Sequence, residues 1–199
     1  MAKPDLNPIL ACLQAQIGPE QPLYTIVDAA QDSAKIMQLL KYPPRQTAMA
    51  SLFEGERVEE LANVAPYLIE FTQRDNPLLI QLVQQGWQHH WAIYFSYPNG
   101  FEAAGDKLRR NLPIKAKDEI GLFRFYDPRV FNLFIPSFDA KQCREFFGAV
   151  SHYWVADVKP RPQAITTVPA MLDYQFDGQQ LAVHPVQTAI SLNHTHGNT

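Results

Sequence analysis

The sequence is poor in cysteine and has no long hydrophobic run, and both shortages restrict what the protein can be. Its two cysteines, Cys12 and Cys143, are too few for a disulfide framework and lack metal-knuckle spacing, so we expect buried thiols. No stretch approaches the ~20 apolar residues that span a bilayer, and the N-terminal segment has no signal-peptide pattern. These absences predict a soluble, cytoplasmic protein.

A basic excess and the common catalytic motifs are also missing. Seventeen Lys and Arg residues against twenty Asp and Glu give a formal net charge of -3, which excludes a general polyanion binder. The nine glycines form neither a dinucleotide nor a P-loop motif, and there is no GxSxG elbow and no HExxH pair. His89 and His90 are adjacent, so their side chains diverge on a regular element. We therefore expect no nucleic-acid partner, cofactor, metal or catalytic residue.

Aromatic residues and prolines are abundant. The chain has 12 Phe, 8 Tyr and 3 Trp, too many for a disordered sequence, and its 199 residues suffice for one domain with a sizeable core. Apolar periodicity and helix caps predict an α/β fold, with a mixed sheet, flanking helices and a short extended or β-hairpin appendage at the C-terminus. The predicted strands are 23–30, 47–53, 67–71, 91–97 and 152–158, with a hairpin of 112–116 and 122–126; the helices are 5–17, 33–40, 57–64, 76–86, 101–111, 128–135 and 139–148.

The composition changes at Lys159, after which the chain is punctuated by prolines and has almost no basic residues. We therefore place an α/β domain at 1–158 and an extended tail at 159–199. Within the tail, LDYQFDGQQLAV predicts a small hairpin that turns at Asp177-Gly178, and the last residues are expected to be disordered.

The densest local pattern is FRFYDPRV, residues 123–130. Read as a strand, it places its two phenylalanines on one face and Arg124 with Tyr126 on the other. Asp127 then caps the helix that the next proline begins, and Arg124 or Arg129 pairs with it or bridges to another element. The block is either a rigid corner between strand and helix or a surface that contacts a partner.

Charged residues leave further alternatives open. Residues 107–129 carry seven basic and three acidic side chains, an excess that is either solvated or docks an acidic segment. Asp28 ends the first predicted strand, where it either caps a turn, while Asp32 caps the next helix, or forms a carboxylate pair with Asp32. A small hydrolase or transferase that uses Asp28 with Asp127 is the alternative function. It requires both carboxylates in one cleft, with at least one raised pKa.

A series of sequence blocks occurs in a fixed order over about residues 22–156: LYTIVDAAQD, SLFEG, APYLIEF, a helix ending in GW, WAIYFSY, LRRNL, GLFRFYDPRVF and FFG. Together they resemble the type VI secretion effector adaptor/chaperone family, whose members are called Tap or Tec adaptors and whose domain was long catalogued as one of unknown function. The resemblance implies a non-catalytic bacterial protein that binds a toxic effector in the cytoplasm, through the effector's N-terminal segment, and helps load it onto the VgrG spike. The residues on the family's signature blocks are Asp28, Phe53, Gly55, Pro66, Tyr67, Arg124, Phe125, Tyr126, Asp127, Pro128 and Arg129.

A chaperone of this kind needs a rigid scaffold and an exposed apolar or amphipathic groove. We predict that Arg124 and Arg129 contact the partner together with exposed aromatic side chains. The aromatic candidates are Tyr94, Tyr97, Tyr126, Tyr153 and Trp154.

Overall fold

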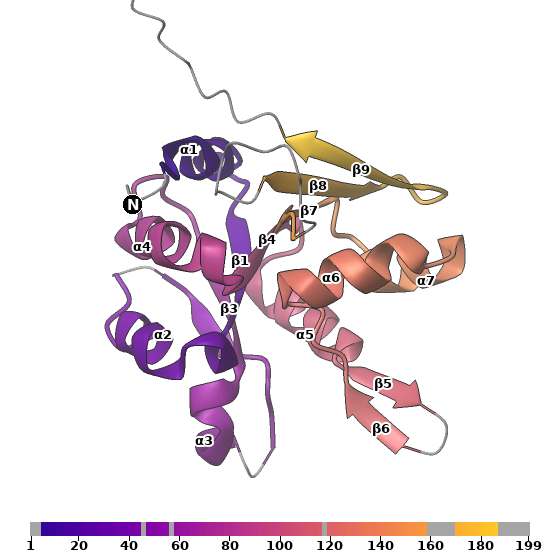
Figure 1. The fold of residues 1–199 in the computed structure, drawn as a ribbon, viewed down its shortest axis with the longest axis horizontal. Helices are drawn as coiled ribbons and strands as arrows, with labels where there is room; N and C mark the ends of the chain where they lie inside the picture. The colour runs from indigo at the N-terminus through magenta and orange to yellow at the C-terminus, as the bar shows by residue number, and fades with distance from the viewer. Residues whose placement is uncertain (1–4, 45–46, 56–57, 117–118, 159–169, 187–199) are drawn as a thin grey trace, which may run out of the picture.

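A computed structural model describes residues 5–44, 47–55, 58–116, 119–158 and 170–186 (Figure 1). Seven strands form one sheet in the order β2-β3-β1-β4-β7-β8-β9, and two more form a separate hairpin. Every one of these strand pairs is antiparallel. The strands are β1 (Leu23–Asp28), β2 (Met49–Ser51), β3 (Pro66–Phe71), β4 (Ala92–Ser96), β5 (Pro113–Ala116), β6 (Glu119–Leu122), β7 (His152–Ala156), β8 (Met171–Phe176) and β9 (Leu181–Val186).

Helices cover both faces of the sheet, which gives three layers (Figure 1). One face packs against α1, α2 and α4, and the other against α5, α6 and α7, while the β5–β6 hairpin projects away from the sheet beyond α5. The helices are α1 (Asn7–Ala15), α2 (Ser33–Leu40), α3 (Val58–Leu61), α4 (Pro77–Gly86), α5 (Phe101–Asn111), α6 (Pro128–Phe134) and α7 (Ala140–Phe147). Short 3-10 turns are η1 (Ala29–Gln31), η2 (Ala62–Val64), η3 (Trp87–His89) and η4 (Ile135–Ser137).

Alternation along the strands divides the core in two, because successive side chains point to opposite faces. In β1, Leu23 and Val27 face the core under α1, α2 and α4, whereas Tyr24 and Ile26 face the core under α5, α6 and α7. All six residues of β1 are buried, and its two polar members, Thr25 and Asp28, have hydrogen-bond partners. The first core is mainly aliphatic, and the second contains most of the buried phenylalanines.

Side-chain caps fix where several helices begin. The Asn76 carboxamide accepts a hydrogen bond from the Leu78 amide at 2.9 Å, just where Pro77 starts α4. Asp139 and Gln142 form a reciprocal capping box at α7. The Asp-Pro and Asn-Pro pairs therefore start helices, as the sequence predicts.

Buried Asn132 joins α6 to the sheet. Its amide nitrogen donates to the carbonyl oxygens of Pro128, at 2.6 Å, and Ala156, at 3.0 Å. Its oxygen accepts a hydrogen bond from the Tyr174 hydroxyl at 3.0 Å. A single side chain thus satisfies polar groups on α6, β7 and β8, which would otherwise cost free energy inside the core.

The predicted fold class is confirmed: the domain is α/β, with a sheet between helices and a C-terminal hairpin. The expected mixed sheet, however, is wrong, because all described strand pairings in the main sheet are antiparallel. Alternating strands and helices suggest parallel crossovers, but the chain after α2 carries β2 to the edge of the sheet beside β3 and not beside β1. The hairpin β5–β6 also stays outside the main sheet.

The FRFY block is not a strand, which corrects a second prediction. Strand β6 ends at Leu122, and the following residues form a turn in which the Asp127 amide donates to the Arg124 carbonyl at 3.0 Å. Phe125 and Tyr126 are consecutive and both buried in the second core. Two neighbouring side chains can enter the same core only because the backbone turns here.

The predicted C-terminal hairpin is confirmed. Strands β8 and β9 turn at Asp177 and Gly178, and Gly178 has a φ of +94°, a conformation that favours glycine. Strand β8 pairs with β7, so this hairpin extends the main sheet. The other predictions for the tail, at 159–169 and 187–199, lie outside the described residues. Within the described ranges, no helix combines the length and apolar character needed to cross a bilayer.

Candidate functional site

Asp28 and Arg124 form one half of a charged corner at the end of β1. One Asp28 oxygen accepts the Ala30 amide at 3.2 Å, and the other accepts Arg124 Nη2 at 2.5 Å. The Asp28 side chain is 1% exposed and that of Arg124 is 41% exposed, so a buried anion is tied to a cation that reaches solvent. Asp28 therefore caps the turn η1, which was one of the two roles that the sequence left open for it.

Asp127 and Arg129 form the other half. Asp127 accepts the Arg129 amide at 2.9 Å, which caps α6, and it accepts Arg129 Nη2 at 2.7 Å. Burial by itself raises the pKa of Asp127, but the hydrogen bonds and charge of Arg129 outweigh it and hold the pKa below its ordinary value. This carboxylate is therefore ionised and saturated with donors.

Gln31 connects the two halves, and sequence reasoning missed it. Its amide nitrogen donates to Asp28 Oδ2 at 2.8 Å and to Asp127 Oδ2 at 3.3 Å, and its oxygen accepts Arg129 Nη2 at 2.8 Å. Asp28 and Asp127 do converge, as the alternative function required. Asp32 instead caps α2 by accepting the Lys35 amide at 3.3 Å, so it does not pair with Asp28.

The remaining signature residues have structural roles. Gly55 has a φ of +99°, which favours glycine, and Phe53 packs against the edge of the second core. Pro66 lies opposite Asp28 in the β1–β3 register, and the Tyr67 hydroxyl donates to the Ala62 carbonyl at 3.0 Å.

The aromatic residues predicted to be exposed are buried, and that prediction is wrong. Three of them lie on β4 and β7, which helices cover on both faces. Tyr97 directly follows β4, and Tyr126 lies at the corner under α6. Burial raises the pKa of the Tyr94, Tyr126 and Tyr153 hydroxyls, in keeping with this position. Of the predicted partner contacts, only Arg124 and Arg129 reach the surface, and the buried aromatic residues are Tyr94, Tyr97, Tyr126, Tyr153 and Trp154.

An apolar groove that the sequence did not single out lies between α5, α7 and the projecting hairpin. Its volume is about 500 Å³, within the range of small-molecule and side-chain pockets. Phe123 lies among the apolar side chains of the groove. The centroid of its ring is 5.9 Å from that of Phe134, 6.2 Å from that of Phe138 and 6.4 Å from that of Phe146. We call this hollow the phenylalanine groove, and its lining residues are Lys107, Arg110, Asn111, Pro113, Ile114, Phe123, Phe134, Phe138, Gln142, Glu145 and Phe146.

Two apolar side chains that line the phenylalanine groove are partly open to solvent. Phe134 is 44% exposed, and Ile114 on the hairpin is 43% exposed. Ile120 and Leu122 are exposed on the other face of the hairpin, because Ile114 pairs with Gly121 and they pair with Lys115 and Pro113. Exposed apolar side chains that gather around a hollow mark surfaces that bind partners.

Lys107 gives one wall of the groove a buried positive group. Its amine donates to Asn111 Oδ1 and to the Glu145 carbonyl, both at 2.8 Å, and so holds α5 against the end of α7. Burial and the nearby charge of Arg110 lower the pKa of Lys107 to about 8. Gly148 must be glycine here, because it has a φ of +57° and an added Cβ would lie 2.7 Å from Lys107 Cε.

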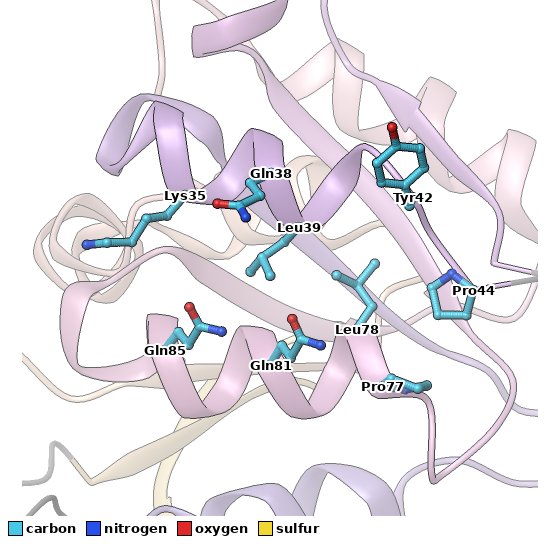
Figure 2. A pocket seen from close by; sticks show the side chains of 9 residues that line it. All are labelled: Lys35, Gln38, Leu39, Tyr42, Pro44, Pro77, Leu78, Gln81 and Gln85. Atoms are coloured by element: carbon cyan, nitrogen blue, oxygen red, sulfur yellow. The ribbon is translucent and has the colours of Figure 1, made fainter.

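A second hollow lies on the opposite face of the molecule, between α2 and α4 (Figure 2). Its volume is about 560 Å³, and Leu39 and Leu78 point into the space between the two helices. Three glutamines are among its lining residues, and its one charged residue, Lys35, pairs with Asp32 at 2.7 Å. Its one aromatic lining residue is Tyr42, which is 78% exposed, so it lacks the cluster of phenylalanines that lines the phenylalanine groove.

Groups that could carry metal or thiol chemistry do not assemble in the described ranges. No three His, Cys, Asp or Glu side chains there are placed to share a metal ion. Cys143 is buried and Cys12 is half-buried, and burial raises the pKa of both thiols. Both cysteines are therefore in the protonated form at neutral pH.

The structure thus defines an α/β domain with a closed charged corner and an open aromatic groove. The chain belongs to the family described as a domain of unknown function (DUF4123), whose model matches residues 23–145. This range runs from β1 into α7 and includes the corner and almost all of the phenylalanine groove. No curated protein and no solved structure matches the chain.

Proposed function

We propose that the protein is a non-catalytic adaptor that binds a type VI secretion effector in the cytoplasm and helps load it onto the VgrG spike. The observation that carries this proposal is the phenylalanine groove, whose exposed apolar margin offers a surface for another polypeptide. The family resemblance of the sequence blocks supplies the identity of the partners.

The charged corner supports this role as scaffold. Through Gln31, Asp28 at the end of β1 is joined to Asp127 at the start of α6. The corner therefore fixes one helix of the aromatic layer relative to the sheet, and a groove bounded by fixed elements loses less conformational entropy when a partner binds.

Co-expression with the toxin encoded beside this gene tests the proposal. We expect the toxin to become more soluble and to co-elute with this protein, and the complex to be retained by immobilised VgrG. A toxin that is equally soluble alone and never co-elutes would contradict an adaptor function.

The convergence of Asp28 and Asp127 is the observation that favours the alternative, a small hydrolase or transferase. His90 lies near them, and burial together with the charge of Arg129 lowers its pKa. The chemistry would need a carboxyl group with a raised pKa and a free oxygen, whereas the pKa of Asp127 is lowered and both its oxygens accept hydrogen bonds. Turnover of an ester or phosphoester substrate that Asp127→Asn abolishes, with the fold intact, would establish the alternative and contradict our proposal.

A further inference from the structure

The phenylalanine groove has two chemically different walls. Helix α5 contributes Lys107 and Arg110, which are one helical turn apart and so lie on the same side of the helix. Helix α7 contributes Gln142 and Glu145 on the other side. The apolar floor therefore has positive charge concentrated along one edge.

These two cations differ from their neighbours in having no anionic partner among the residues that the structure describes. Arg109 lies 2.9 Å from Glu54 and 3.2 Å from Asp106, and the arginines of the charged corner are paired with aspartates. In contrast, no carboxylate of the described residues lies within ion-pair distance of Lys107 or Arg110. Within the described part of the chain, the positive edge of the groove therefore has no carboxylate to balance its charge.

Lys107 differs from an ordinary surface lysine because its charged group is buried in the wall of the groove. It is only 7% exposed, yet it lines the groove and its hydrogen bonds go to two neutral oxygens. A charged group removed from water is costly unless an opposite charge compensates it. An incoming carboxylate would supply that compensation and would also offset the repulsion between Lys107 and Arg110.

We propose that the phenylalanine groove binds an acidic amphipathic segment of the partner protein. The segment's apolar side chains pack on Phe123, Phe134 and Phe146, and a carboxylate beside them faces Lys107 and Arg110. This inference rests on the proposed adaptor function and specifies the chemistry of the effector segment that the groove accepts.

Selection from a displayed library of random peptides of about 16 residues, long enough for ~4 helical turns, tests the inference. We expect the bound peptides to be enriched in Asp or Glu next to large apolar residues. Enrichment of neutral or basic peptides, or no enrichment at all, would overturn it.

Matched variants then locate the selected peptides. Arg110→Glu should weaken their binding at least about tenfold, whereas Lys41→Glu, an equal change of charge at the end of α2, should not. Phe134→Asp should weaken it at least about thirtyfold, whereas Leu133→Asp, its 70%-exposed neighbour on α6 that does not line the groove, should leave it within about twofold. Equal losses within each pair would place the peptides elsewhere and contradict the inference.

The same four variants separate this inference from the adaptor function. If the toxin co-elutes equally with all four variants, the adaptor function stands and the groove assignment is wrong. If acidic peptides bind the groove but the toxin never co-elutes, the groove assignment stands and the adaptor function fails.

Discussion

The two helical layers pack on opposite faces of one sheet, and they differ in the side chains that line their surface hollows. Under α1, α2 and α4 the core is largely aliphatic, and the hollow between α2 and α4 is lined by a mixture of glutamines, leucines and prolines with Lys35 and Tyr42. Under α5, α6 and α7 the core is aromatic, and its phenylalanines continue outward until Phe134 and Phe138 line an open groove. Both layers leave some apolar side chains exposed, but the second lines its hollow with four phenylalanines, whereas the aromatic residue in the hollow of the first is Tyr42.

The hairpin β5–β6 accounts for this difference. It connects α5 to the charged corner, yet it forms a two-stranded sheet of its own and all four residues of β6 are exposed. Because the hairpin does not fold back over α7, Phe123 at its base remains at the surface of the core. An isolated two-stranded hairpin is marginally stable in water, so we expect a bound partner to order it further.

The largest expected effect compares buried residues of the two layers. Phe146→Ala should cost about 3–5 kcal/mol and Leu79→Ala about 2–5 kcal/mol of unfolding free energy, because each empties a buried site. Only Phe146→Ala should also weaken effector binding when folded protein is compared, since Phe146 lines the groove. Urea unfolding and a binding titration measure the two quantities, and equal binding losses would remove the distinction between the layers.

The charged corner should matter for folding and not for binding. Arg124→Ala should cost about 2–3 kcal/mol, because it leaves the Asp28 carboxylate buried without its cation. A second change, Asp28→Asn, should recover part of that loss. If Arg124→Ala instead leaves stability unchanged and abolishes effector binding, the corner is itself a partner-binding surface.

The pH dependence of stability should reveal Lys107. Its folded pKa of about 8 lies below the ordinary value of 10.5, so above pH 8 the unfolded state holds more protons and stability rises with pH. The rise should be about 1 kcal/mol between about pH 8 and 9 and should be missing in Lys107→Met. Urea unfolding at several pH values measures how stability changes with pH in the natural protein and in Lys107→Met. The contributions of all other titratable groups cancel in the difference between the two curves. Parallel curves would show that Lys107 is not the titrating group.

The smallest expected effects come from two exposed apolar side chains. Ile120 on the hairpin is 74% exposed and Tyr42 after α2 is 78% exposed. Ile120→Ser and Tyr42→Ser should each change the unfolding free energy by no more than about 0.5 kcal/mol. Co-purification with the effector should decline only for Ile120→Ser, and a decline only for Tyr42→Ser would assign the partner to the first layer.

The sequence predicts local structure well because caps and periodicity act over short distances. Asn76, Asp127 and Asp139 begin helices as expected, and Asp177-Gly178 turns the last hairpin. Strand pairing was predicted less well, because the position of β2 depends on the long-range pairing of Ser51 with Tyr67 and not on its neighbours in sequence.

The site was only partly predictable for the same reason. Asp127 and Arg129 are two residues apart, so their pairing follows from the sequence, but the bridge through Gln31 spans nearly a hundred positions. The aromatic candidates failed because nothing local shows that helices cover β4 and β7 on both faces. The density of phenylalanines from Phe123 to Phe147 was the available signal for the groove, although it does not show which rings remain exposed.

Hydrogen exchange of the complex with the co-purified effector tests the central claim most directly, since it reports which backbone segments a partner protects. The account predicts slower exchange in β5, β6 and α7, with α1, α2 and α4 unchanged. Protection confined to α1, α2 and α4, with the hairpin exchanging as fast as in the free protein, would contradict it.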